Sequence, residues 1–258
     1  MISLSWKVKT YFNYLINRKD EYSLHSPFAF ELYNYLKKDY SDKNLELINS
    51  IRNAQLQNKT AIDVYDLGAG SQTITSHKVS EITTYAAIPS KYGKLLYRLV
   101  QKFKPETVLE LGTSTGISTL YLALANDSRV VSIEGNKSIS SVAKDNFIKA
   151  GCTNIEILTG EFSSQLPVAI NKLQKIDFAF IDGNHQYQPT IDYFNLIKNN
   201  SEENSIFIFD DIYWSQGMTQ AWEKIKVDKV VKVSMDFYRL GIVFLKKELK
   251  KQHYILKI

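Results

Sequence analysis

The 258-residue sequence predicts an α/β fold with a mostly parallel sheet and a helical region at the N-terminus. Three observations predict it. From residue 105 onward, short apolar runs alternate with segments of helical length, which is typical of parallel strands covered by helices. The last two apolar runs are too close together for a crossover helix, so they should form an antiparallel hairpin. Residues 1–60 instead show apolar positions at helical spacing.

The N-terminal region predicts three helices followed by a transition. WKVKTYFNYLI and LELINSIRNAQL both repeat apolar residues at helical spacing. Between them, Ser26 followed by Pro27 is a favourable helix start, with the serine as the cap and the proline in the first turn. In the stretch 61–104, AIDVYDL favours a short strand, and KYGKLLYRLVQKF favours an amphipathic helix that Pro105 ends.

Seven strands are expected after residue 105, with a helix after each of the first five. A helix that Gly151 closes is expected between the second and third strands. We expect the helices of residues 1–60 to pack over the carboxyl ends of these strands. The expected strands are TVLELG, RVVSIEG, NIEILTG, KIDFAFID, SIFIFDD, VVKVSMDF and GIVFLKK, of which only the last should be antiparallel.

Composition limits the function classes only loosely. The net charge of +5 and the pI of about 9.0 permit binding to nucleic acid, anionic lipid or a small anion without requiring any of them. The single cysteine, Cys152, allows no internal disulfide, which fits a reducing compartment. We find no signal peptide and no run near the ~18 apolar residues of a membrane span, so we expect a cytoplasmic protein.

The stretch VLELGTSTGIS is the most informative motif. A buried strand ends at Glu110, a turn with Gly112 and Gly116 follows, and a helix then begins. Such glycines let the backbone approach a ligand closely, and the helix N-terminus directs free N–H groups at it. Glu134 ends the next strand, where an acid can accept hydrogen bonds from both hydroxyls of a ribose. The sequence therefore predicts a nucleoside-containing cofactor.

The same layout would also suit NAD, but three details favour S-adenosyl-L-methionine. The glycine pattern lacks the third glycine of the dinucleotide fingerprint. Glu110 before the first glycine suits a cationic ligand better than a pyrophosphate. The closing hairpin is not the ending of a six-stranded parallel dinucleotide fold.

Residues 105–258 resemble class I S-adenosylmethionine-dependent methyltransferases, in particular the branch of catechol O-methyltransferase and bacterial small-molecule O-methyltransferases. The resemblance implies a Rossmann-like, seven-stranded methyltransferase sheet with an antiparallel last strand. It implies a methyltransferase domain over 105–258, with 1–104 as a helical cap, and O-methylation of a small-molecule hydroxyl. The cofactor-binding residues that it implies are Glu110, Gly112, Thr113, Ser114, Gly116, Ser118, Glu134, Gly160, Glu161, Phe162 and Asp182.

Three carboxylates end the fourth and fifth expected strands: Asp182, Asp210 and Asp211. Such strand ends adjoin in a doubly wound sheet, and converging carboxylates suit a hard cation such as Mg²⁺. The repulsion between them can also be relieved by a proton on one of them. The resembling family carries a catalytic lysine three residues after its first metal aspartate. Here His185 stands at that spacing, and we expect Asp182 and His185 to be catalytic, with His185 as the base.

Other functions stay open from the sequence. An RNA or protein methyltransferase and a non-catalytic cofactor-binding scaffold are the alternatives. Nucleic acid is disfavoured because no base-flipping tetrad and no RNA-binding module are present. A homodimer is compatible with the sequence, and the methyl acceptor cannot be read from it. YDLGAGS, with Asp66–Ser71, also resembles a first methyltransferase motif, and we interpret it as a loop above the main site.

Overall fold

The computed structural model describes residues 4–38, 40–65 and 74–258, so the loop at Asp66–Ser71 lies outside the described residues. The chain forms two compact units. The inserted unit is Tyr40–Gln174, and the terminal unit combines Met1–Asp39 with Lys175–Ile258. The predicted division into a cap over 1–104 and a methyltransferase domain over 105–258 stays a prediction.

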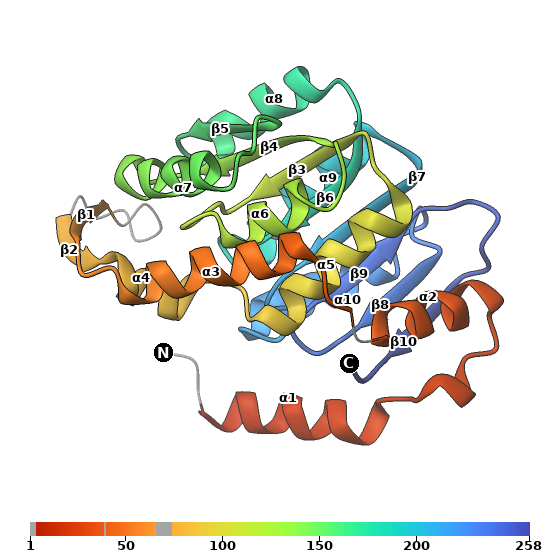
Figure 1. The fold of residues 1–258 in the computed structure, drawn as a ribbon. Helices are drawn as coiled ribbons and strands as arrows, with labels where there is room; N and C mark the ends of the chain where they lie inside the picture. The colour runs from red at the N-terminus through yellow and green to blue at the C-terminus, as the bar shows by residue number, and fades with distance from the viewer. Residues whose placement is uncertain (1–3, 39, 66–73) are drawn as a thin grey trace. The chain divides into compact units, whose positions relative to one another are not determined.

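The inserted unit contains three parallel strands, because each strand is followed by a helix that returns the chain to the same edge. The strands are β3 (Thr107–Leu111), β4 (Arg129–Glu134) and β5 (Ile155–Thr159), and β4 pairs with both others (Figure 1). The connecting helices are α6 (Ile117–Ala123), α7 (Lys137–Lys149) and α8 (Phe162–Leu173). Every residue of β3 is buried, as its apolar sequence predicts. Gly151 follows α7 at φ 69°, the left-handed conformation expected of a closing glycine.

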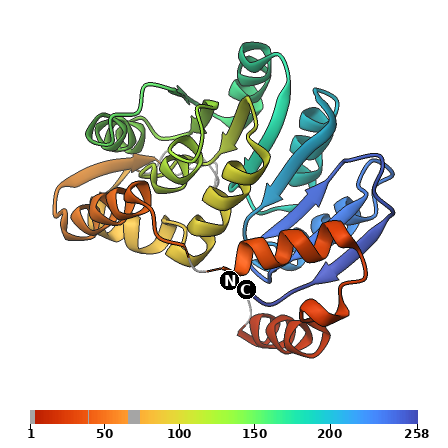
Figure 2. The ribbon, with the colours of Figure 1, turned by 45° about the vertical axis from the view of Figure 1, so that its right-hand side comes forward.

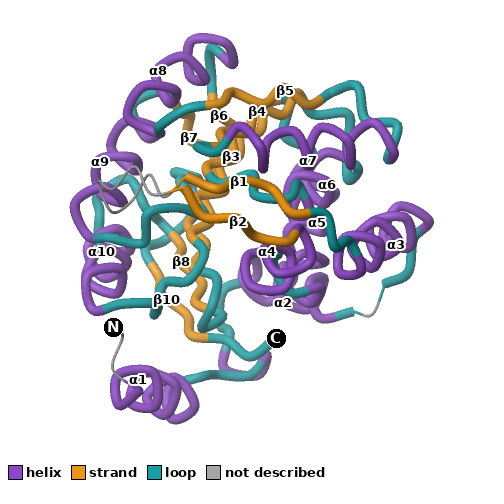
Figure 3. Tube along the Cα trace, turned by 90° about the vertical axis from the view of Figure 1, so that its left-hand side faces the viewer, coloured by secondary structure: helices purple, strands orange, loops and turns teal. Residues whose placement is uncertain are grey.

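The first part of the inserted unit is helical apart from one small hairpin. It contains α3 (Lys43–Gln57), β1 (Ala61–Tyr65), β2 (Ile74–Lys78), α4 (Val79–Ala86) and α5 (Ser90–Phe103). Among the described residues, the strands β1 and β2 pair only with each other, in antiparallel register (Figure 3). The predicted amphipathic helix is α5, and it stops at Lys104 in the left-handed conformation, one residue before Pro105.

The terminal unit holds the remaining strands. They are β6 (Ile176–Ile181), β7 (Ser201–Phe209), β8 (Val233–Asp236), β9 (Gly241–Phe244) and β10 (Gln252–Ile255), with α9 (Tyr187–Lys198) and α10 (Gln216–Lys226) between them. β6 and β7 are parallel, and β9 runs antiparallel between β7 and β8, which confirms the closing hairpin. The fold is thus the predicted α/β class with a mostly parallel sheet. One detail was wrong: β10 follows the antiparallel strand and pairs with β8 in parallel, so the antiparallel strand is not the last.

Two N-terminal helices belong to the terminal unit, α1 (Leu4–Asn17) and α2 (Pro27–Lys37), joined by a short 3-10 turn at Glu21–Ser23. As predicted, Ser26 caps α2, and its hydroxyl accepts a hydrogen bond from the Ala29 N–H. Figure 2 shows both helices, in red and orange, beside the blue C-terminal strands. The Phe28 ring packs edge-on against Phe244 of β9.

The helix α1 reaches the carboxyl ends of β7 and β8, as expected for an N-terminal helix. The Lys7 ammonium lies 4.5 Å from the ring centroid of Trp214, which follows β7. The ring of Tyr11 packs edge-on against Tyr238, which follows β8, at 5.1 Å between centroids. No helix of the described residues is long and apolar enough to cross a membrane.

Candidate active site

The glycine loop between β3 and α6 has a backbone that few side chains tolerate. Gly112, Ser114 and Gly116 all have positive φ, at 99°, 47° and 84°. The N–H groups of Gly112 and Thr113 donate to the Ile133 carbonyl, which fastens the loop to β4. A Cβ on Gly116 would lie 2.6 Å from the Phe147 ring, so this position requires glycine.

Glu110 lies fully buried beneath this loop. One carboxylate oxygen accepts hydrogen bonds from the Ser132 hydroxyl, at 2.6 Å, and from the Thr119 hydroxyl, at 2.5 Å. Its other oxygen, Oε1, is buried and has no partner in the described structure. Burial raises the pKa of Glu110 to about 7, against the opposing effect of the hydroxyl donors, Ser118 among them. A positive group bound here would draw Glu110 into its charged form.

Glu134 ends β4 in an oriented position. Its two carboxylate oxygens accept hydrogen bonds from the Ser114 N–H, at 2.8 Å, and the Asn136 N–H, at 2.9 Å. Burial raises the pKa of Glu134, and these backbone donors act in the opposite direction. Each oxygen keeps a further lone pair for a ligand hydroxyl. The Ser114 hydroxyl and the Asn136 amide nitrogen are also buried without a partner in the described residues. These groups fit a polar, hydroxyl-bearing ligand.

The third predicted segment, Gly160–Phe162, joins the end of β5 to α8. The Gly160 N–H donates to the Glu134 carbonyl at 2.9 Å, so the two strand ends are linked directly. Glu161 is the N-cap residue of α8, and Phe162 is the first residue of that helix. The predicted cofactor-binding residues of the inserted unit therefore lie in or beside its glycine loop, or at the carboxyl ends of β4 and β5. Asp182 belongs to the terminal unit, and its role toward the cofactor stays a prediction.

Polar residues of α7 and α3 that the sequence did not indicate support the glycine loop. The Asn146 amide of α7 donates to the Thr115 carbonyl at 2.8 Å, and the Gln55 amide of α3 donates to Asn146 at 2.8 Å. Asn146 is fully buried and Gln55 nearly so. In the sequence, each is simply a polar residue in an amphipathic helix. Nothing there distinguishes such a buried residue from one that faces solvent.

In the terminal unit, Asp182 and Asp210 directly follow β6 and β7, two paired parallel strands. The feature that the sequence did not predict is Arg239, in the turn between β8 and β9. Its guanidinium donates to both oxygens of Asp210, with Nε–Oδ1 at 2.8 Å and Nη2–Oδ2 at 2.7 Å. Its Nη2 also lies 3.5 Å from Asp211 Oδ2. Among the described residues, no group of three or more His, Cys, Asp or Glu side chains is arranged to hold a metal ion.

The electrostatics of this cluster follow from burial and from one arginine. Burial raises the pKa of Asp210 and of Asp211, and in both cases Arg239 acts in the opposite direction. Burial alone would lower the pKa of Arg239, but its hydrogen bonds to Asp210 outweigh that effect and raise it. The Lys7 ammonium also favours the charged form of Asp211. The guanidinium thus supplies the positive charge that adjacent buried carboxylates need.

His185 lies beside Asp182, as its spacing predicts. Its Nε2 is 3.6 Å from Asp182 Oδ1, and its Nδ1 is buried without a partner in the described structure. Burial lowers the pKa of His185, so the ring is neutral at pH 7. The Ser215 hydroxyl donates to the His185 carbonyl at 3.1 Å and also caps α10, which fixes this segment of the backbone. The Trp214 ring lies 6.1 Å away, between centroids.

Comparison with known proteins shows what the chain is similar to. A family model described as a methyltransferase domain matches residues 109–212, which include the glycine loop, Glu134 and the strand-end carboxylates. This part of the chain is thus similar to methyltransferase domains. The chain is 28% identical over 130 residues to a catechol O-methyltransferase of Niastella koreensis, an alignment that covers 49% of the chain and 58% of that protein, little more than half its length. It is 28% identical over 186 residues to the O-methyltransferase imqG of Aspergillus flavus, covering 69% and 73% of the two chains.

Solved structures agree with the methyltransferase fold. The O-methyltransferase from Bacillus cereus in complex with SAH superposes with a TM-score of 0.58 at 21% identity, covering 84% of this chain and 97% of that one. The O-methyltransferase TomG from Streptomyces achromogenes in complex with SAM gives a TM-score of 0.58 at 18% identity, covering 84% and 95%. At these identities the likeness establishes the fold alone.

Proposed function

We propose that this methyltransferase transfers the methyl group of S-adenosyl-L-methionine to a hydroxyl group of a small molecule. The observation that carries the proposal is His185, with Nε2 beside Asp182 and Nδ1 buried without a partner in the described structure. Such an imidazole can take a proton from a hydroxyl at Nδ1 while the carboxylate stabilises the imidazolium from the other side. The relatives, a catechol O-methyltransferase and an O-methyltransferase by name, support the same reaction.

The inserted unit would hold the cofactor. Glu134, oriented by two backbone N–H groups, would accept hydrogen bonds from the ribose hydroxyls. The glycine loop would receive the methionine part, and Glu110 beneath it would favour that part's positive charge. Gly160–Phe162, linked to the Glu134 strand end, would border the adenine. S-adenosyl-L-methionine supplies a methyl group on a positively charged sulfur.

The residues of the terminal unit would handle the proton of the acceptor. The acceptor oxygen bonds to the methyl carbon, the carbon–sulfur bond breaks with its electron pair left on sulfur, and the hydroxyl proton passes to His185 Nδ1. Because burial lowers the pKa of His185, the base is in its active neutral form at pH 7. Protonation of His185 should remove the base only at a pH below the ordinary imidazole value of about 6.5, because its pKa is lowered.

The predicted Mg²⁺ site at Asp182, Asp210 and Asp211 has a competitor in Arg239. Both oxygens of Asp210 are engaged by the guanidinium, and the same group lies near Asp211. The three carboxylates, with these partners, do not fit a shared metal unless Arg239 moves away. We therefore favour a mechanism without a metal, in which Arg239 neutralises the charge of the carboxylates. His185, assisted by Asp182, then removes the proton from the acceptor hydroxyl. The predicted cytoplasmic location and homodimer stay predictions.

Binding and transfer test the proposed function together. S-adenosylhomocysteine should bind in a calorimeter, and Glu134→Ala should weaken it by about 1.5–3 kcal/mol, the cost of hydrogen bonds to a charged group. The matched control is Glu248→Ala, which removes a carboxylate that is 70% exposed. With labelled S-adenosyl-L-methionine and a panel of phenols and catechols, His185→Gln should lose about 10²–10⁴-fold in rate. Binding of NADH in place of S-adenosylhomocysteine would overturn the proposal.

The role of Arg239 has its own test. The purified protein, treated with a chelator, should keep its melting temperature and its methyl transfer, and millimolar Mg²⁺ should raise neither. Arg239→Gln leaves Asp210 buried without its cation, so we expect a loss of about 3–5 kcal/mol in the free energy of unfolding. Arg129→Gln removes an arginine whose side chain is 54% exposed and serves as the control. A melting temperature that rises with Mg²⁺ in the wild type but not in Asp182→Ala would restore the metal site.

A further inference from the structure

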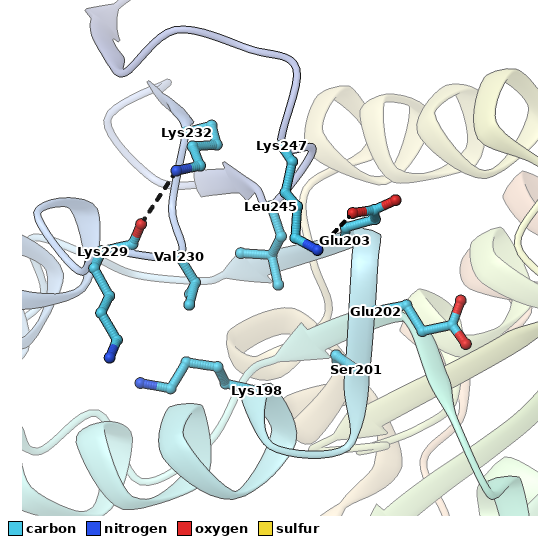
Figure 4. A pocket seen from close by; sticks show the side chains of 9 residues that line it. All are labelled: Lys198, Ser201, Glu202, Glu203, Lys229, Val230, Lys232, Leu245 and Lys247. Carbon is cyan, nitrogen blue, oxygen red and sulfur yellow. Dashed lines mark hydrogen bonds and ion pairs between the residues drawn. The ribbon is translucent and has the colours of Figure 1, made fainter.

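A cavity lies in the terminal unit at the amino end of β7, with a volume of about 770 Å³ (Figure 4). Its lining comes from the end of α9, the start of β7, the stretch before β8 and the stretch after β9. The carboxylate cluster follows the opposite end of β7, nine residues further along the strand. At ~3.3 Å per strand residue, about 30 Å separate the two. This cavity is therefore distinct from the carboxylate site of the same unit.

The cavity is unevenly charged. Four lysines and two glutamates line it, but two of the lysines have carboxylate partners: Lys198 with Asp228 at 3.0 Å, and Lys247 with Glu203 at 2.8 Å. Lys229 and Lys232 have no carboxylate partner anywhere in the described structure.

Neither ammonium group lies within ion-pair distance of a carboxylate in the described structure, although the charge of Lys229 favours the ionised form of the neighbouring Asp228. The one hydrogen bond of the Lys232 ammonium goes to the Lys229 carbonyl, at 3.5 Å. In Figure 4, Lys198 and Lys229 extend to the same side of the cavity, whereas the Glu202 carboxylate points to the opposite side. An excess of positive charge therefore faces the cavity.

The floor of the same cavity is apolar. Leu245, which is buried, and Val230 lie between the lysines in Figure 4, and the aliphatic stems of the lysines extend that surface. A volume of this size accommodates a molecule of metabolite size. We propose that this cavity binds an amphipathic organic anion, with an apolar body on Leu245 and Val230 and an anionic group attracted by the ammonium groups of Lys229 and Lys232. The proposal is independent of methyl transfer.

Fluorescence titration with anilinonaphthalene sulfonate, an aromatic anion, tests this site on the full chain. The wild type should show one saturable enhancement, and Lys229→Gln with Lys232→Gln should bind the dye about five- to tenfold more weakly, the effect of about 1 kcal/mol. The control, Lys144→Gln with Lys149→Gln, removes the same charge from exposed positions of α7 and should bind as the wild type does.

Two further measurements test whether the variants stay folded and whether binding needs the anionic group. Circular dichroism melts should be the same for the wild type and both double variants, so that a loss of binding is not a loss of fold. Phenylnaphthylamine has the same apolar body without the sulfonate, and it should bind weakly and equally to wild type and variant. An absent dye signal, equal dye affinity in the Lys229 and Lys232 variant, or equally tight binding of the neutral dye would each overturn the proposal.

Discussion

Glu110 holds its proton in the folded protein at a pH where the unfolded chain has lost it. Its pKa rises from an ordinary 4.5 to about 7 because it is completely buried. Between these two values the native state binds more protons than the unfolded state, so the free energy of unfolding should fall as pH rises through that window. Above about pH 7 this contribution should be constant.

Glu110→Gln should remove that pH dependence, because an amide cannot titrate. Relative to the variant, the wild type should lose on the order of 3 kcal/mol of stability between pH 4.5 and pH 8. Urea unfolding of both proteins at several pH values measures the difference. Glu248→Gln, at an exposed position, should follow the wild type throughout. Parallel pH curves for the wild type and Glu110→Gln would contradict the raised pKa.

Individual residues differ in how far the sequence could identify them. Glu110 and Glu134 could be predicted, because an acid at the end of an apolar strand beside a glycine turn is an uncommon local pattern. Arg239 could not, because its partner Asp210 lies 29 residues away along the chain and the pairing depends on how the β8–β9 turn is placed. Ser132 and Thr119 were missed for a similar reason, since their hydroxyls acquire meaning only when they reach the buried Glu110.

Gly116 in the glycine loop and Gly151 at the end of α7 have similar backbone angles but differ in the space around them. Gly116 has φ 84° and no room for a Cβ, whereas Gly151 has φ 69° with no atom within 4 Å of an added Cβ. Gly116→Ala should therefore combine strain with overpacking against Phe147 and cost about 2–4 kcal/mol in unfolding free energy. Gly151→Ala should cost about 1–2 kcal/mol from strain alone. Urea unfolding compares them, and equal losses would show that Phe147 gives way.

The elements that the sequence predicted and those it missed differ in apolar content. The buried strands β3, β4, β6 and β7 were found, because a short uninterrupted apolar run is typical of a strand that is covered on both faces. β2 (ITSHK) and β10 (QHYI) were missed, because short polar strands are stabilised by the partners they pair with and have little pattern of their own. The antiparallel direction of β9 was therefore predicted, but the polar strand β10 that follows it was not.

The two ends of the chain are joined inside the terminal unit. The Tyr14 hydroxyl of α1 donates to the Leu256 carbonyl at 2.7 Å, and the Tyr33 hydroxyl of α2 donates to the Lys257 carbonyl. Both tyrosines are buried. The backbone of Lys19 also bridges to Leu256. N-terminal helices thus hold the segment that ends β10, a link across more than 220 residues of chain that no local sequence pattern could predict.

Removing these two hydroxyls should loosen the C-terminal strand without changing the packing of the rings. Tyr14→Phe with Tyr33→Phe leaves the buried Leu256 carbonyl and the half-buried Lys257 carbonyl without these donors, so we expect a loss of about 2–3 kcal/mol in unfolding free energy. Hydrogen exchange should accelerate first at β10, whose amides bond to β8, and less in β6 and β7 at the other side of the unit. Tyr22→Phe is the control, because that side chain is 85% exposed and should change neither quantity. If exchange at β10 stays at the wild-type rate, pairing with β8 alone holds the strand, and the N-terminal helices are not what secures it.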